Sequence, residues 1–115
     1  MQSYKDLIVW QKSMTLVENI YGLMKFLPNE EKYVLSDQMR RSAISIPSNI
    51  AEGYDRRSTK DYINFLSFAR GSNSELQTQL YICNRLNFLS KKQIQPSIDL
   101  TEEISKMLNS LINKL

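Results

Sequence analysis

The 115-residue sequence contains no histidine, and this absence excludes several classes of protein at once. Without an imidazole, the chain cannot form a Ser-His-Asp or Cys-His catalytic arrangement. A di-iron bundle built on Glu-x-x-His motifs is excluded for the same reason. One cysteine and no histidine are also too few ligands for an ordinary zinc site. We therefore expect no catalytic residues, no metal and no cofactor.

Other residue types are scarce as well. The single cysteine, Cys83, excludes an internal disulfide and fits a reducing cytosol. Three glycines and three prolines are few for an all-β or loop-rich protein. No apolar run approaches the ~20 residues that span a bilayer, and the segment MQSYKDLIVWQKS lacks the basic start and long apolar stretch of a signal peptide. We expect a cytoplasmic protein without a membrane segment.

The length and composition of the chain indicate one globular domain over residues 1–115. Hydrophobic residues make up 42% of the chain and charged residues 23%, which is typical of a folded protein rather than a disordered one. The formal net charge is +3 and the isoelectric point is near 9.0. This mild basic excess is compatible with nucleic-acid binding, although it does not by itself indicate that function.

Apolar residues recur at spacings of three and four along the first 27 residues, as on one face of an α-helix. Ser3 and Asp6 have the spacing of a capping pair, and Pro28 predicts the end of the helix because it disfavours helical geometry at Leu27. The predicted buried stripe consists of Leu7, Trp10, Met14, Val17, Tyr21 and Met24. Further apolar residues lie off this stripe. They indicate either contact with a subunit or partner, or a broad stripe that faces the core: Ile8, Leu16, Ile20 and Leu23.

Three more helices are predicted after this one. The second ends at Gly53, and the third continues to about Leu89 through the sequence Gly71-Ser72-Asn73. Their predicted N-terminal caps are Ser36 for the second helix, Ser58 with Asp61 for the third and Ser90 with Gln93 for the fourth. Short connections favour antiparallel neighbours, and no strand pattern is present. The predicted fold is therefore all-α, an antiparallel up-down-up-down four-helix bundle.

The stretch RRSAISIPSNIAEG, residues 40–53, is unusual for a helix that only packs. Pro47 lies in its interior, where proline costs about 3 kcal/mol relative to alanine. Four polar residues share one helical face at spacings of four, four and three: Arg41, Ser45, Asn49 and Glu52. This polar stripe is either a solvated face with one ion pair, or a hydrogen-bonded network at a helix–helix or subunit contact.

Three segments make the chain similar to a known family: VWQKS at 9–13, LPNEEKYVLSDQMRRSAISIPSNIAEG at 27–53 and FARGSNSEL at 68–76. The chain resembles the four-helix-bundle proteins encoded in intervening sequences of bacterial 23S rRNA genes. It also resembles the related accessory variability determinant of diversity-generating retroelements, a pentameric barrel that binds nucleic acid and partners a reverse transcriptase. The resemblance implies a homopentamer with an RNA- or DNA-related role and a partly buried structural stripe on the second helix.

The predicted topology brings the start of the first helix, the connection at 54–58 and the C-terminus to one end of the bundle. Six basic residues would gather there as a candidate nucleic-acid interface: Lys5, Lys12, Arg56, Arg57, Lys60 and Lys114. Nearby aspartates dilute this charge, so one chain presents a weak electrostatic surface. A ring of copies would multiply it, and phosphate affinity rises with the number of neutralised charges.

Two other functions are compatible with the residues. The chain could be a protein-interaction or scaffold module without nucleic-acid contact, with a reverse transcriptase or another protein as its partner. An enzyme would have to rely on carboxylates such as Glu52 and Glu75, but nothing places them at a catalytic spacing. Cys83 lies on the apolar stripe of the third helix and reads as a small core residue. We therefore expect a non-enzymatic protein.

Overall fold

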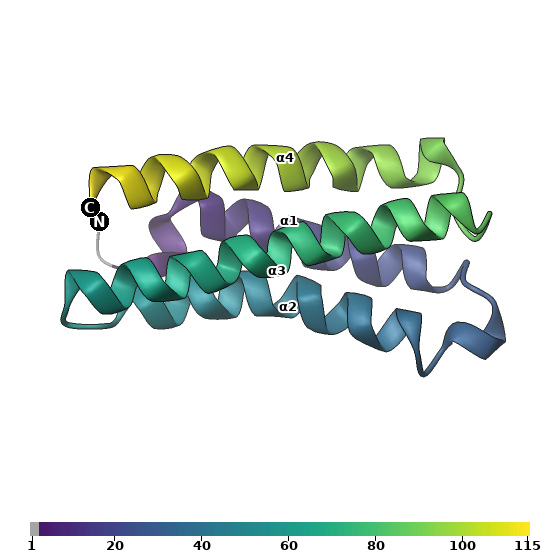
Figure 1. The fold of residues 1–115 in the computed structure, drawn as a ribbon, viewed down its shortest axis with the longest axis horizontal. Coiled ribbons are helices and arrows are strands. Elements are labelled where there is room, and N and C mark those ends of the chain that lie inside the picture. Colours follow the sequence, from purple (N-terminus) through teal and green to yellow (C-terminus); the bar gives the residue numbers. More distant parts are fainter. Residues whose placement is uncertain (1–2) are drawn as a thin grey trace.

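Four α-helices, running alternately up and down, form the part of the chain that the structure describes, residues 3–115 of a computed structural model (Figure 1). No strand occurs within these residues, which confirms the predicted antiparallel four-helix bundle. The bundle measures 43 × 24 × 20 Å along its principal axes. The helices are α1 (Ile8–Met24), α2 (Leu35–Tyr54), α3 (Thr59–Arg85) and α4 (Lys91–Lys114), with short 3-10 turns η1 (Tyr4–Asp6) and η2 (Asn29–Glu31).

The predicted cap of the fourth helix forms as a reciprocal pair. The Gln93 N–H donates to Ser90 Oγ at 3.1 Å, and the Ser90 N–H donates to Gln93 Oε1 at 2.8 Å. At the start of α3, the Asp61 N–H donates to Ser58 Oγ at 3.1 Å. Both serines thereby accept from N–H groups that have no partner inside the helix, so the sequence located these two helix starts.

Two predicted caps are corrected by the structure. Ser3 and Asp6 do form a capping pair, with the Ser3 N–H donating to Asp6 Oδ2 at 3.3 Å, but they cap the 3-10 turn η1. The helix α1 begins only at Ile8, because Leu7 has an extended backbone. Helix α2 begins at Leu35 after Val34, which offers no side-chain cap, so Ser36 lies inside its first turn. The two cap motifs therefore indicated roughly where α1 and α2 begin, but not the first residue of either helix.

Helix α3 is continuous through residues 71–73 and ends at Arg85, earlier than the predicted Leu89. Asn87 adopts a left-handed conformation with φ of 62°. The Phe88 N–H then donates to the Cys83 carbonyl at 2.9 Å, and the Asn87 N–H to the Asn84 carbonyl at 3.1 Å. This is the double hydrogen bond of a Schellman motif, with asparagine in the position that glycine more often occupies.

The buried face of α1 differs from the predicted stripe. Leu16 and Ile20, which lie off the predicted stripe, are fully buried in the core of the single chain, so these two residues do not form a subunit contact. Met14 and Tyr21, which lie on the predicted stripe, are 40% and 47% exposed. Ser13 occupies the position between the buried residues Val9 and Leu16 at spacings of four and three. Its hydroxyl donates to the Trp10 carbonyl at 2.8 Å, so a serine can lie in the core. This polar residue made the true stripe look interrupted.

Gly53 has a different role from the predicted helix stop. Helix α2 continues to Tyr54, and no described glycine has a positive φ. Gly53 is buried against α3, and a Cβ atom on it would lie 2.7 Å from the Cβ of Phe65 and 3.1 Å from Cδ1 of Tyr62. The absence of a side chain therefore allows α2 and α3 to approach closely at this end of the bundle.

Pro47 lies buried in the interior of α2, as the sequence indicated. Because proline has no N–H, the carbonyl of Ala43 loses its usual partner in the helix. Pro47 lines a groove between α1 and α2 together with Trp10 and Val17. The proline ring thus contributes apolar surface on the side of α2 that faces α1.

Candidate functional site

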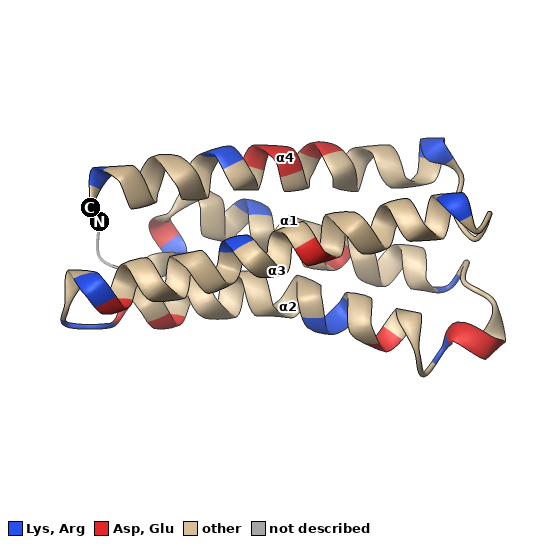
Figure 2. Ribbon diagram, viewed as in Figure 1, with Lys and Arg blue, Asp and Glu red and all other residues tan. Residues whose placement is uncertain are grey.

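The end of the bundle that carries both chain termini also carries the connection between α2 and α3 (Figure 1). The topology therefore brings together most of the candidate basic residues, as the up-down-up-down order requires. Figure 2 shows that lysines and arginines also occur along the middle of the bundle and at its other end, interspersed with acidic residues. Five members of the candidate nucleic-acid interface belong to the elements at this end, which are η1, the connection between α2 and α3, the start of α3 and the end of α4: Lys5, Arg56, Arg57, Lys60 and Lys114.

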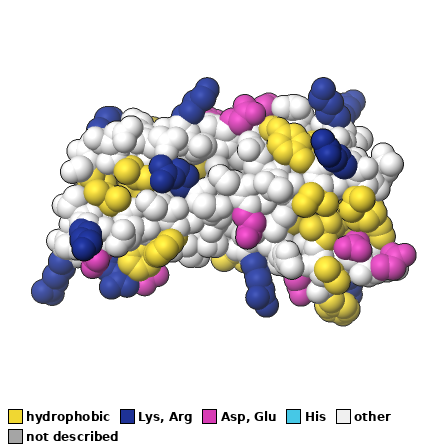
Figure 3. Space-filling view, viewed as in Figure 1, with side chains coloured by type: hydrophobic (Ala, Val, Ile, Leu, Met, Phe, Trp, Pro, Cys, Tyr) yellow, Lys and Arg dark blue, Asp and Glu magenta, His cyan; other side chains and the backbone are white. Residues whose placement is uncertain are grey.

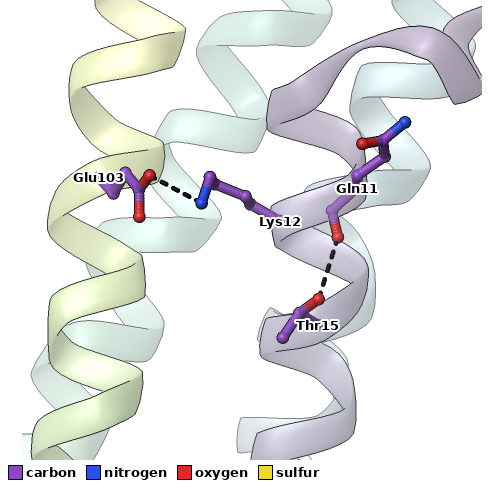
Figure 4. Close-up of polar contacts among 4 residues, drawn as sticks. All are labelled: Gln11, Lys12, Thr15 and Glu103. Carbon is purple, nitrogen blue, oxygen red and sulfur yellow. Dashed lines mark hydrogen bonds and ion pairs between the residues drawn. The ribbon is translucent and has the colours of Figure 1, made fainter.

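Two of the six candidate cations are engaged within the chain. Lys12 lies on the side of the bundle, where its Nζ is 2.8 Å from Oε1 of Glu103 and joins α1 to α4 (Figure 4). Arg56 pairs with Glu52 at 2.8 Å, and its guanidinium lies 4.7 Å from the centroid of the Phe65 ring. These contacts hold both side chains in defined positions and partly neutralise their charge.

The other four candidates are exposed and form no ion pair with any residue from 3 to 115. Arg57 and Lys60 flank the start of α3, but the exposed carboxylates of Asp55 and Asp61 lie next to them in sequence. One chain therefore presents only a few free cations at this end, spaced among acidic groups. A surface of this kind binds phosphates weakly unless several copies combine.

The four residues of the polar stripe on α2 do not form one network within the chain. The Asn49 Nδ2 donates to the Ser45 carbonyl at 2.8 Å and to Ser45 Oγ at 2.9 Å, so these two residues lie together and are half-buried. Glu52 pairs with Arg56 instead. Arg41 is exposed and makes no hydrogen bond or ion pair with the described residues. Within one chain, the structure thus brings two of the four residues into contact.

Helix α3 continues this polar surface. The hydroxyls of Ser45 and Ser72 lie 2.9 Å apart, and the Ser42 hydroxyl donates to Glu75 Oε1. Two exposed apolar residues lie on the same side of α3, Phe68 (60% exposed), four residues before Ser72, and Ile82 (40% exposed), seven residues after Glu75. We call this surface the α2–α3 face: Arg41, Ser45, Asn49 and Glu52 of α2 with Phe68, Ser72, Glu75 and Ile82 of α3.

The α2–α3 face is only partly polar. Figure 3 shows apolar side chains exposed on the side of the molecule where α3 faces the viewer. The serine–serine and serine–glutamate contacts tie the two helices together at the centre of the face. Sequence periodicity identified the α2 half of this surface. It missed the α3 half, because the residues there differ in polarity and so form neither a polar nor an apolar stripe. These residues recur at helical spacing: Phe68, Ser72, Glu75 and Ile82.

A second polar cluster lies between α3 and α4. The buried Asn73 Nδ2 donates to the Thr101 carbonyl at 2.8 Å, and the Gln77 Nε2 donates to Thr101 Oγ1 at 3.0 Å. Asn73 Oδ1 and Gln79 Oε1 are buried without a hydrogen-bond partner among the described residues. Asn73 is buried although it interrupts the apolar pattern of the third helix in the sequence, so its burial was not predicted. The cluster fixes the relative position of α3 and α4.

Nothing in the described chain resembles a catalytic arrangement. Burial raises the pKa of the Cys83 thiol from 9.0 to about 11, with a smaller contribution from Glu31, so the thiol is protonated and a poor nucleophile near neutral pH. Burial also raises the pKa of Tyr62, with a smaller effect from Tyr54. Glu52 and Glu75 are engaged by Arg56 and Ser42. No cluster of three or more potential metal ligands occurs within residues 3–115.

The fold and this surface define a four-helix bundle with a buried apolar core and a mixed polar and apolar α2–α3 face. None of the helices formed by residues 3–115 is both long and apolar enough to cross a bilayer. The chain belongs to the 23S rRNA-intervening sequence protein family, whose model matches residues 5–110. This membership confirms the resemblance to the proteins encoded in intervening sequences of 23S rRNA genes.

The structure is also similar to a solved one. A protein of unknown function from the S23 ribosomal protein family of Bacteroides thetaiotaomicron matches with a TM-score of 0.84 and 35% sequence identity. The match covers 91% of this chain and 98% of that one. The chain has no significant match among curated proteins. Neither the family description nor that of the solved structure names an enzymatic activity.

Proposed function

We propose that the chain is a non-enzymatic cytoplasmic protein that assembles into a homopentamer and binds RNA or DNA through a basic surface formed on assembly. The observation that carries this proposal is the α2–α3 face. It exposes large apolar side chains beside an arginine, Arg41, that has no partner among residues 3–115. Exposed apolar patches with polar neighbours are typical of protein–protein contacts.

Assembly through the α2–α3 face would complete its polar stripe. Arg41 and Glu52 lie at the two ends of this stripe, with Ser45 and Asn49 between them. A guanidinium, a hydroxyl, an amide and a carboxylate can satisfy one another where water is excluded. The contact would also remove Phe68 and Ile82 from water, which favours association. The resemblance to a pentameric barrel supports five copies.

Assembly would also strengthen the electrostatic surface. The net charge of one chain is only +3, but a ring of five carries five times that charge. The free cations Arg57 and Lys60 would then be repeated around one end of the ring. The resemblance to the accessory variability determinant, which binds nucleic acid, supports a nucleic acid as the ligand.

The assembly is tested by measuring mass in solution. We expect light scattering to give a mass five times the 13.5 kDa of the single chain. Phe68→Glu should lower this mass to that of smaller species without unfolding the helices, because a carboxylate buried in the contact would lose its hydration. Tyr33→Glu is the matched control, since Tyr33 is 77% exposed outside the α2–α3 face. A wild-type protein that stays monomeric at high concentration contradicts the proposed assembly.

Nucleic-acid binding is tested separately, with a duplex RNA titrated at increasing salt. We expect affinity to fall steeply with salt, and the double variant Arg57→Gln, Lys60→Gln to bind ~10-fold or more weakly at low salt. Lys91→Gln, Lys92→Gln removes the same charge from exposed residues at the other end and should retain binding. Absence of RNA and DNA binding by an intact pentamer would instead favour the protein-interaction module, for which the exposed apolar residues provide the surface.

A further inference from the structure

The end of the bundle opposite the termini contains a pocket of about 340 Å³ between the end of α1 and the start of α2. The chain that connects these helices, residues 25–34, forms one of its walls. Residues of both helices and of the connection contribute side chains. Those that bear on its chemistry are Tyr21, Lys25, Lys32, Ser36 and Arg40.

The residues that line the pocket carry an excess of positive charge, although Glu30 and Glu31 lie next to two of them in sequence. Three cations line it, Lys25, Lys32 and Arg40, and its lining residues, all within the described chain, include no carboxylate. Arg40 pairs with Asp37 at 3.2 Å, which holds the guanidinium in place and neutralises part of its charge.

The two lysines are exposed and form no ion pair with residues 3–115. Lys25 Nζ lies 5.3 Å from the centroid of the Phe26 ring, and Lys32 Nζ lies 5.4 Å from that of the Tyr33 ring. Both rings are exposed, so the two flexible lysine side chains can turn from them to an anion in the pocket, with a fixed arginine beside them.

Uncharged donors lie in the same pocket. Ser36 is 2% exposed, and its hydroxyl has no hydrogen-bond partner among the described residues. It belongs to the first turn of α2, where Val34 supplies no side-chain cap and the first helical hydrogen bond runs from the Gln38 N–H at 3.2 Å. The N–H groups before Gln38 thus carry the positive end of a 20-residue helix. A hydroxyl, free N–H groups and cations together form the donor set that phosphate oxygens accept from.

An aromatic ring completes the pocket. Tyr21 is 47% exposed, and the Arg40 guanidinium lies 5.5 Å from its ring centroid. An aromatic ring beside a phosphate site offers a surface on which a nucleobase can stack. Inorganic phosphate would use only the charged half of such a pocket, whereas a nucleotide would use both halves.

We propose that this pocket binds the phosphate group of a nucleotide, supplied either by a free mononucleotide or by the terminal phosphate of an RNA strand. The phosphate lies among Lys25, Lys32 and the Ser36 hydroxyl, and the base lies against Tyr21. This inference goes beyond the proposed function, because the site belongs to a single chain and lies at the end opposite Arg57 and Lys60. It holds whether or not the chain assembles or binds duplex RNA.

The test is a titration of isotopically labelled protein with adenosine 5′-monophosphate at constant ionic strength, followed by NMR. We expect saturable shifts in the backbone amides of residues 35–37, and smaller, weaker-binding shifts with inorganic phosphate. The variant Lys25→Gln, Lys32→Gln should bind the mononucleotide ~10-fold more weakly, since it loses two charge-assisted contacts. Ser36→Ala should weaken binding several-fold at unchanged charge. Helix content and thermal midpoint establish that each variant is folded.

Controls separate the pocket from a general electrostatic effect. Lys91→Gln, Lys92→Gln removes the same charge from the same end of the bundle, outside the pocket, and should bind like the wild type. Equal losses in the two double variants, an unchanged affinity in Ser36→Ala, or shifts that adenosine without phosphate also produces would overturn the proposal. So would shifts that never saturate.

The source of the phosphate is then resolved with short RNA strands. Tighter binding of a 5′-phosphorylated strand than of the same strand with a 5′-hydroxyl identifies a terminal RNA phosphate as the ligand. Equal binding of the two strands, with saturable binding of the mononucleotide, identifies a free nucleotide. If the pocket does not bind a nucleotide, the solution mass and the effect of Arg57→Gln, Lys60→Gln on duplex binding are unaltered. The two proposals can therefore fail independently, and the measurements show which one has failed.

Discussion

Replacing Leu16 with alanine is expected to lower the free energy of unfolding by about 3 kcal/mol. Leu16 is 0% exposed in the middle of α1, where the surrounding helices leave little room for the core to collapse around a smaller side chain. The substitution removes buried apolar surface and leaves a cavity, and both effects disfavour the folded state. Urea unfolding followed by helix content measures the change. Data at two protein concentrations separate unfolding from dissociation.

Met14→Ala is the matched control for this prediction. Met14 lies on the same helix and was placed on the buried stripe by sequence periodicity, but it is 40% exposed in the structure. We expect its substitution to cost less than ~1 kcal/mol, because less apolar surface returns to water. Equal losses for Leu16 and Met14, or a larger loss for Met14, would show that α1 is rotated away from the orientation described.

Replacing Gly53 with leucine is expected to destabilise the fold by about 3 kcal/mol or more. Even a single Cβ atom on Gly53 would lie 2.7 Å from the Cβ of Phe65, which belongs to the base of that side chain and cannot rotate away. The helices α2 and α3 would have to separate, and the core between them would lose contact. The thermal midpoint and the free energy of unfolding in urea both report this loss.

Gly71 provides the comparison for this substitution. A Cβ atom on Gly71 meets nothing within 4 Å, and the residue lies exposed in the continuous helix α3. Gly71→Leu is therefore expected to be neutral or to stabilise the chain by roughly 0.5–1 kcal/mol, because glycine is a poor helix former. A stable Gly53→Leu variant would contradict the close approach of α2 and α3.

The caps and the loops show which local features of the fold were readable from the sequence. Ser58 and Ser90 each accept a hydrogen bond from the N–H three residues later, so the starts of α3 and α4 follow from local hydrogen bonds. The end of α3 was misjudged because Asn87 replaced the glycine that usually marks a helix terminus. For α1, apolar residues on several faces left the buried side undecided, and the serine at position 13 favoured the wrong stripe.

The α2–α3 face also has features that the sequence predicts and features that depend on the packing of the helices. Helical periodicity alone places Arg41, Ser45, Asn49 and Glu52 on one side of α2, and this arrangement holds in any fold that keeps the helix. Their partners depend on the neighbouring helix. Ser45 contacts Ser72 because α3 passes beside it, whereas Glu52 pairs with Arg56, four residues further along the chain.

The sequence by itself determined the number of helices, their alternating directions, the starts of α3 and α4 and the absence of a histidine-based site. These properties depend on residues close to one another in the chain, or on composition. Only the tertiary structure decided which side of α1 is buried, why position 53 is glycine, and that Tyr21, Lys25, Lys32, Ser36 and Arg40 surround one pocket. The physical reason is that these properties depend on the rotation and spacing of packed helices, which arise from contacts between residues far apart in the chain.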